Sequence, residues 1–210
     1  MMRLTIFGAT GRTGKKLVAQ ALEAGHKVVA YARTPSKLQI EHERLAAVEG
    51  DVHDAGQVAS AVAGAEAVLS VLGPTSNEPT YEVSRGMANI VAAMEAQGVQ
   101  RLVQSVGAGV SDPRDQPGLF DRAIKVALWV FSRHVYEDMA RTAELIRASD
   151  LDWTLVRVPM LTDDPAQGDL KVGYLGQGVG PRVSRADLAT FMLEQVEDPT
   201  WVRQAPVISS

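Results

Sequence analysis

Short apolar runs rich in β-branched residues alternate along this chain with longer segments whose apolar positions have helical spacing. The apolar runs predict strands over residues 4–7, 27–32, 45–49, 65–71, 101–105 and 153–158. The segments between them predict helices over residues 13–24, 54–63, 81–97 and 121–149. Asp54 can cap the second of these helices, and Gly98 is predicted to end the third. This alternation is typical of βαβ units, whose crossovers are right-handed and whose strands form a parallel sheet.

The pattern changes after Pro159, which ends the sixth predicted strand. Residues 171–174 and 182–183 are predicted to be short strands, and residues 204–208 add a last strand. Ser184 can cap a helix over residues 185–196. The whole chain, residues 1–210, is therefore predicted to be a single α/β domain with a doubly wound, Rossmann-type parallel sheet.

A glycine-rich turn joins the first predicted strand to the first helix and reads Gly8-Ala9-Thr10-Gly11-Arg12-Thr13-Gly14. Gly8 permits a tight turn, Gly11 permits close approach of a pyrophosphate, and Gly14 permits close packing of helix against strand. The free N–H groups at the start of the helix favour a phosphate. The turn therefore predicts a dinucleotide site that includes Thr10, Arg12 and Thr13, and the alternative is a tight turn without a ligand.

Charge is unevenly distributed along the 210 residues, whose formal net charge is −4. Residues 1–40 hold seven basic residues and one acidic residue, whereas residues 41–210 hold 14 basic and 24 acidic residues. A basic first quarter on an acidic body favours one localised anionic ligand. A nucleic acid usually requires a broader basic surface, so no nucleic-acid partner is expected.

The composition also bears on the compartment of the protein. Cysteine is absent, which excludes disulfides and thiolate metal sites and fits the reducing cytoplasm. No apolar stretch approaches the ~20 residues of a membrane span, and Gly8 interrupts the first apolar run too early for a signal peptide. His26, His42 and His53 show no metal-ligand spacing. A cytoplasmic protein without a metal or a membrane partner is predicted.

Several segments of the chain together resemble the atypical short-chain dehydrogenase/reductase superfamily. They are the Gly-x-x-Gly-x-x-Gly turn, Arg33, Gly50-Asp51-Val52, residues 89–94 and residues 178–193. Within this superfamily, the chain is similar to the small NAD(P)H-binding group that includes biliverdin IXβ reductase/flavin reductase, over nearly its whole length. The resemblance implies that Asp51 and Val52 face the adenine and that Leu72 and Gly73 line the middle of the cofactor. It also implies a set of cofactor residues nearer the nicotinamide, namely Ser105, Val106, Gly107, Pro159, Met160 and Leu161.

The residue after the second strand bears on the choice of dinucleotide. NAD-preferring sites usually place an acidic residue there, but this chain has Arg33, ~20 residues beyond the turn. A guanidinium can bind a 2′-phosphate through two hydrogen bonds, and Arg12, Ser36 and Lys37 can add donors. NADP(H) is therefore predicted, with NAD(H) as the second choice. The alternative is that Arg33 and Lys37 are solvated loop residues.

Two expected catalytic patterns are incomplete. The Tyr-x-x-x-Lys pattern of many short-chain dehydrogenases begins at Tyr136, but Ala140 occupies the lysine position. Enzymes like biliverdin IXβ reductase carry a serine and a histidine where this chain has Gly107 and Met160. Ser105 and Tyr136 remain as catalytic candidates. The structural alternatives are a local hydrogen bond for Ser105 and packing for Tyr136.

Without these groups, hydride transfer depends on positioning, which suits an acceptor that needs no side-chain acid. We expect NADPH-dependent reduction of free flavin, as a substrate rather than a bound group, or of a quinone or tetrapyrrole; FMN and riboflavin are the flavin candidates. C-terminal segments would form the acceptor pocket. Its apolar platform would consist of Met160, Leu161, Trp129, Phe120 and Phe131. The alternative for each of these side chains is ordinary core packing. The alternative function is a non-enzymatic redox sensor that binds the dinucleotide and a protein partner. The sequence leaves the oligomeric state open.

Overall fold

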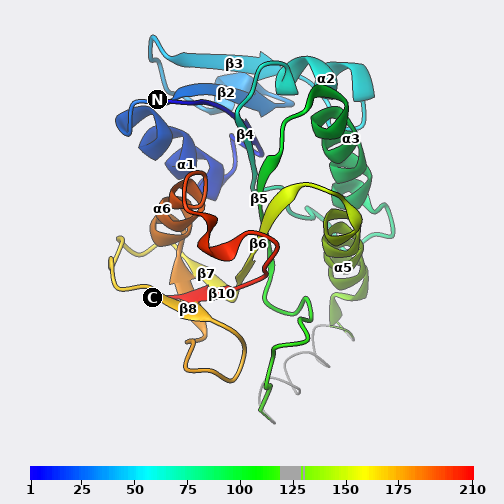
Figure 1. Cartoon of the computed structure of the whole chain (residues 1–210), viewed down its shortest axis with the longest axis vertical. Coiled ribbons are helices and arrows are strands. Elements are labelled where there is room, and N and C mark those ends of the chain that lie inside the picture. Colours follow the sequence, from blue (N-terminus) through cyan, green and yellow to red (C-terminus); the bar gives the residue numbers. More distant parts are fainter. Residues whose placement is uncertain (119–128, 130) are drawn as a thin grey trace.

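The computed structural model describes residues 1–118, 129 and 131–210, with an eight-stranded sheet at the centre (Figure 1). The strands lie in the order β3-β2-β1-β4-β5-β6-β10-β8. Their bounds are β1 Arg3–Phe7, β2 Lys27–Ala32, β3 Leu45–Glu49, β4 Ala67–Ser70, β5 Arg101–Gly107, β6 Asp152–Val158, β8 Lys171–Gly173 and β10 Val207–Ser209. Among the described residues, every pairing in this sheet is parallel except that of β10 with β8. The strand order reverses at β1, which confirms the predicted doubly wound, Rossmann-type fold.

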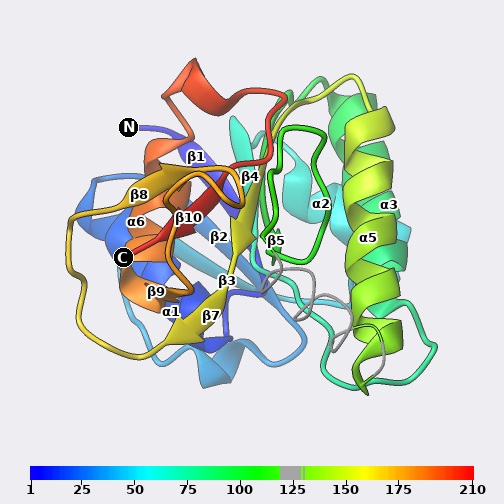
Figure 2. The same cartoon turned by 90° about the horizontal axis from the view of Figure 1, so that it is seen from below.

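Helices cover both faces of the sheet, as Figures 1 and 2 show. α1 (Arg12–Glu23) and α6 (Arg185–Glu194) lie against one face. α2 (Ala55–Val62), α3 (Glu82–Gln97) and α5 (Arg133–Ala148) lie against the other. Each layer buries its own apolar core, and the strand residues between the two layers are covered on both sides, which is usual for a parallel sheet.

Local sequence signals set several helix ends as predicted. Asp54 Oδ1 accepts a hydrogen bond from the Gln57 N–H at 3.0 Å at the start of α2. Ser184 Oγ accepts one from the Asp187 N–H at 3.0 Å at the start of α6. Gly98 ends α3 with a φ of +69°, a conformation that glycine adopts without a steric penalty.

The chain after β6 contains a strand that the sequence pattern does not predict. Pro159 ends β6 as expected, but Met160–Thr162 then forms β7. β7 pairs in parallel with β9 (Arg182–Ser184) in a separate two-stranded sheet. The two strands come from distant parts of the sequence, so a local apolar pattern carries no signal for their pairing.

α3 and α5 are the longest helices of the described residues. α3 and α5 have 16 residues each, and no helix in this part of the chain is long and apolar enough to cross a membrane. The predicted helix over residues 121–149 is confirmed in its C-terminal part, since α5 spans Arg133–Ala148 with Ser132 at its N-cap. Residues 119–128 and 130 lie outside the described residues, and the prediction for them stays a prediction.

Candidate functional site

Two glycines of the turn between β1 and α1 are required by its geometry: Gly8 by its left-handed backbone conformation and Gly14 by close packing. Gly8 has a φ of +77°, and its carbonyl oxygen accepts a hydrogen bond from the Gly11 N–H at 3.0 Å. A Cβ at Gly14 would lie 2.1 Å from the same carbonyl oxygen. Gly8 therefore makes the tight turn, and Gly14 makes the close contact between helix and strand, as the sequence predicts.

Gly11 has a different environment, because it is exposed and has an extended backbone conformation that any residue can adopt. It lies at the N-cap of α1, and an added Cβ would meet the Gly8 carbonyl oxygen at 3.3 Å, a tight contact that requires a small local shift. Among the described residues, no side chain caps α1. The N–H groups and the positive dipole end of α1 are therefore available to an anion. The turn fits a pyrophosphate group in shape and in charge.

A cavity of about 390 Å³ lies beside this turn, at the carboxyl ends of β1, β2, β3 and β4. Eight residues of the predicted cofactor set line it: Gly8, Thr10, Gly11, Arg33, Asp51, Val52, Leu72 and Gly73. The fold thus brings Gly8 close to Gly73, which follows it by 65 residues in the sequence. Ligands of open α/β sheets bind in such a crevice, beside the point where the strand order reverses.

Several further residues line this cavity although the sequence motifs do not predict a role in binding for them. Tyr31 belongs to β2, Thr75 follows β4, and Glu82 is the first residue of α3. His53 and Val83 line it as well. Tyr31, His53 and Thr75 lie at or shortly after the carboxyl end of a predicted strand, which is the signal that could have found them. Glu82 and Val83 begin α3 and carry no such signal.

One edge of the cavity is basic. Arg33 directly follows β2, and Lys37 ends the short 3-10 helix Pro35–Lys37; both side chains are exposed and line the cavity. Residues 31–37 include no acidic residue that could bind a ribose 2′-hydroxyl at this edge. A positive charge at this place favours a phosphate on the adenosine ribose over a free 2′-hydroxyl.

Arg12 forms an ion pair with Asp163, the residue that follows β7. Its Nη1 atom lies 2.7 Å from Asp163 Oδ2, and Arg185 Nη1 lies 2.9 Å from Asp163 Oδ1. Asp163 therefore links the glycine-rich turn to α6. Arg12 is not among the residues that line the cavity, and Thr13 and Gly14 are buried beneath the turn. A contact between Arg12 and a phosphate stays a prediction.

The residues predicted nearer the nicotinamide lie at the end of β5 and where β6 is followed by β7, outside the lining of the cavity. Residues 105–107 and 159–161 come close together because β5 and β6 are neighbours and the Ala108 N–H donates to the Val158 carbonyl at 2.7 Å. Met160 is 55% exposed, which excludes ordinary core packing for it. Contact of these residues with a cofactor stays a prediction.

The aromatic residues of the expected acceptor platform are also exposed where they are described. Trp129 is 50% exposed and Phe131 is 79% exposed. The Arg133 guanidinium lies 5.5 Å from the centre of the Trp129 ring. Phe120 lies outside the described residues. Trp129 and Phe131 are thus accessible to a ligand, although the platform itself stays a prediction.

Tyr136 is half-buried on α5, with Ala140 one turn later. The tyrosine with a strong polar contact in this region is Tyr81, whose hydroxyl donates to Glu137 Oε2 at 2.9 Å. This hydrogen bond, together with burial, raises the pKa of Tyr81. The hydrogen bond links the N-cap of α3 to α5, and the raised pKa makes the phenol a weaker acid.

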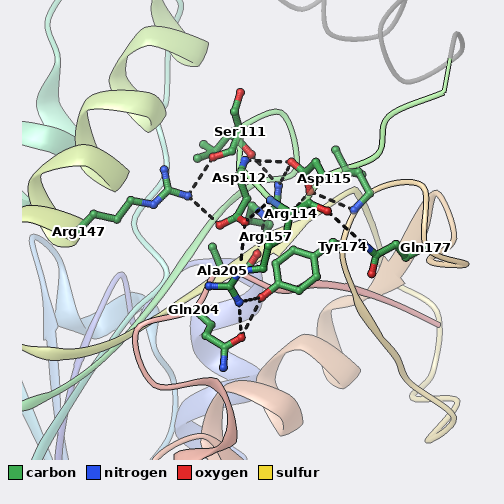
Figure 3. Close-up of polar contacts among 12 residues, drawn as sticks. Ser111, Asp112, Arg114, Asp115, Arg147, Arg157, Tyr174, Gln177, Gln204 and Ala205 are labelled. Carbon is green, nitrogen blue, oxygen red and sulfur yellow. Dashed lines mark hydrogen bonds and ion pairs between the residues drawn. The ribbon is translucent and has the colours of Figure 1, made fainter.

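A polar network that the sequence pattern does not indicate holds the loop after β5 (Figure 3). Arg157 on β6 donates to the Ala205 carbonyl at 2.7 Å and to both carboxylate oxygens of Asp115. Asp115 Oδ1 also accepts the Leu175 N–H at 3.1 Å. Residues 111–118 are therefore tied to β6 and to the turn after β8.

The chain belongs to the NAD(P)H-binding family, whose model matches residues 8–199. The match begins at Gly8, the first glycine of the turn. The chain is thus a member of an NAD(P)H-binding oxidoreductase family of the atypical short-chain dehydrogenase/reductase type, as its motifs predict.

Relatives of known class support the same assignment. The chain is 27% identical to oxidoreductase AgnL4 of Paecilomyces divaricatus, over 95% of this chain and 81% of that protein. It is 27% identical to oxidoreductase aflX of Aspergillus parasiticus, over 96% of this chain and 80% of that protein. The protein is therefore an oxidoreductase with a nicotinamide cofactor.

Solved structures share the fold over the whole chain. The oxidoreductase ylbE of Lactococcus lactis superposes with a TM-score of 0.83 at 20% identity, covering 100% of this chain and 91% of that chain. A short-chain dehydrogenase/reductase of Veillonella parvula, solved in complex with NADP, superposes with a TM-score of 0.80 at 24% identity, covering 100% and 94%. At these identities the likeness shows the fold.

Proposed function

We propose that the protein is an NADPH-dependent oxidoreductase that reduces free flavin, or a similar flat acceptor such as a quinone or a tetrapyrrole. The observation that carries the choice of cofactor is the basic edge formed by Arg33 and Lys37 beside the glycine-rich turn. The NADP found with the Veillonella parvula protein supports the same choice.

Different residues of this chain would bind different parts of the dinucleotide. The glycine-rich turn would hold the pyrophosphate through the N–H groups of α1. Arg33 and Lys37 would hold the 2′-phosphate. The nicotinamide half would lie against residues 105–107 at the end of β5 and residues 159–161 after β6. The nicotinamide, when bound, supplies the hydride.

The flat acceptor is proposed from the side chains available for catalysis. Ala140 at the lysine position leaves Tyr136 without the partner that would lower its pKa. A flavin needs no such acid, because one of its ring nitrogens takes the hydride and solvent supplies a proton to another. Met160, Trp129 and Phe131 are exposed apolar side chains that a flat ring can cover.

Parallel assays with several acceptors test this function. The purified protein is mixed with NADPH and FMN, riboflavin, biliverdin or a quinone, and the loss of the near-ultraviolet absorbance of NADPH is followed. Turnover with a flavin is the expected result. Tight binding of NADPH without turnover of any acceptor would overturn the proposal and favour a redox sensor.

A further inference from the structure

We propose that Tyr31 and Asn89 are positioning residues that fix the adenine-facing wall of the cavity before the dinucleotide binds. The inference rests on the proposed function, because it concerns the same cavity. The wall is the turn formed by Gly50, Asp51 and Val52 after β3, and all three residues line the cavity. Tyr31 and Asn89 approach this turn from different elements, β2 and α3.

Tyr31 holds the first of two successive carbonyl groups in the turn. Its hydroxyl donates to the Asp51 carbonyl at 2.9 Å. The side chain is only 1% exposed, and its ring packs against Phe7 with the ring centres 5.1 Å apart. The hydroxyl therefore has little freedom to leave its position. Burial, with the nearby charges of Asp51 and Asp54, raises the pKa of Tyr31 to about 12, so the hydroxyl remains a donor at neutral pH.

Gly50 shows how closely the turn approaches Tyr31. A Cβ at Gly50 would lie 2.2 Å from the Tyr31 hydroxyl oxygen and 2.5 Å from Cζ of the same ring. Only a glycine lets the backbone come this near to the phenol. The close contact between β2 and the turn therefore requires both the Tyr31 ring and a glycine at position 50.

Asn89 holds the second carbonyl from the side of α3. Its Nδ2 donates to the Val52 carbonyl at 2.8 Å. Close by on α3, a Cβ at Gly86 would lie 2.7 Å from Val52 Cγ2. The side chain of Val52 therefore lies directly against the helix backbone, while its carbonyl is held by Asn89.

Further hydrogen bonds complete the fixation of Asp51. Its N–H donates to Gln57 Oε1 at 3.0 Å, and its Oδ1 accepts the His53 N–H at 3.0 Å. With two successive carbonyls held by side chains, the peptide planes on both sides of Val52 have set orientations. A wall that is ordered in advance lowers the entropy cost of binding, so loss of either side chain should weaken binding of the adenine half.

The test uses fragments that report on the two halves of the dinucleotide separately. Tyr31→Phe and Asn89→Ala are made singly, and Kd is measured for NADPH, for 2′,5′-ADP and for reduced nicotinamide mononucleotide. Loss of one such hydrogen bond should weaken NADPH and 2′,5′-ADP by roughly three- to tenfold and leave the nicotinamide fragment unchanged. In turnover, KM for NADPH should rise while kcat stays constant.

Two matched variants separate positioning from general destabilisation. Gln97 is the last residue of α3, and its Nε2 donates to the Ala59 carbonyl at 2.8 Å. Gln97→Ala removes a bond of the same kind and length as Asn89→Ala, and Tyr174→Phe removes a tyrosine hydroxyl far along the sequence from the turn. Both controls should bind 2′,5′-ADP like the wild type.

The outcomes distinguish this inference from the proposed function. If Tyr31→Phe and Asn89→Ala bind 2′,5′-ADP as tightly as Gln97→Ala does, while Arg33→Ala weakens NADPH, the positioning role is wrong and the cofactor proposal stands. If the wild type binds neither NADPH nor 2′,5′-ADP, both are wrong.

Discussion

Arg157 and Asp115 form a bidentate ion pair in which two guanidinium nitrogens each lie 2.7 Å from a different carboxylate oxygen. Arg157 is fully buried, so its charge depends on this partner instead of on water. Burial alone would raise the pKa of Asp115, but hydrogen bonds from Arg157 and from the N–H groups of Asp112 and Leu175 outweigh it. The pKa of Asp115 therefore lies below its ordinary value.

Asp115→Asn should lower the free energy of unfolding by about 3 kcal/mol at neutral pH, because it leaves the Arg157 charge buried without a counter-charge. The folded-state pKa of Asp115 is depressed, so its stabilisation is present above the unfolded-state pKa of ~3.9 and is lost as the pH falls through the folded-state value. Urea unfolding of both proteins at neutral and at acid pH measures this. The gap between them should shrink as the pH falls below ~4.

An exposed ion pair provides the control for this measurement. Glu43 Oε1 lies 3.9 Å from Arg44 Nη1 at the surface, and Glu43→Gln should change stability by less than about 0.5 kcal/mol. Equal losses in the two variants would contradict the special role of the buried pair.

Arg33→Ala should weaken NADPH by about ten- to a hundredfold and affect NADH little, because only NADPH has a 2′-phosphate for the guanidinium. Titration of both dinucleotides gives the two affinities. Lys27→Ala is the matched control, since Lys27 is an exposed basic residue at the opposite end of β2. Equal affinities of the wild type for NADPH and NADH would show that Arg33 does not select the cofactor.

Gly11→Val should abolish dinucleotide binding in a folded protein. Gly11 has a φ of −70° and a ψ of 166°, which valine also adopts, and a side chain at this exposed position would crowd the turn where the pyrophosphate is proposed to bind. Gly14→Ala should instead destabilise the fold, because its Cβ meets the Gly8 carbonyl oxygen at 2.1 Å. Circular dichroism and NADPH titration separate the two effects. Unchanged NADPH affinity in Gly11→Val would mean that the turn is only structural.

Tyr136→Phe and Ser105→Ala should each reduce flavin reduction by less than about tenfold, because a true general acid typically contributes 10²–10⁴-fold. Met160→Asp should be more harmful, since a charge would face the apolar acceptor. Met160 is 55% exposed, so this change should leave the fold intact, and Met160→Gln is the uncharged control. Steady-state kinetics with FMN and NADPH measure these rates. A thousandfold loss in Tyr136→Phe at unchanged cofactor affinity would restore a tyrosine acid.

The regular part of the fold is predictable because its signals are local. The sequence pattern predicts β2 and β3 with the bounds found, and it also predicts the caps at Asp54, Ser184 and Gly98. Each of these signals acts within a few residues of the chain. β7 is missed because its pairing with β9 joins distant segments, and a proline just before it suggests an end.

In the candidate site, too, some residues are predictable from local motifs and others depend on tertiary contacts. The positions of Gly8, Gly11, Arg33 and Asp51 follow from motif spacing, and the structure brings all four to one cavity. The hydrogen bonds of Tyr31 and Arg157 depend on how layers of the sheet and its loops meet. A strand pattern marks Tyr31 and Arg157 only as residues of β2 and β6, so their partners cannot be found from it.

The place of β10 between β6 and β8 has a consequence for biosynthesis. β8 is made well before β10, which is its only described neighbour in the sheet, and β6 keeps an open edge until residues 204–209 arrive. The nascent chain can therefore assemble β1–β5 while it is still being translated, whereas this part of the sheet must wait. A chain truncated after Arg203 should expose the edge of β6 to proteases and to aggregation, which limited proteolysis would detect as early cleavage near β8.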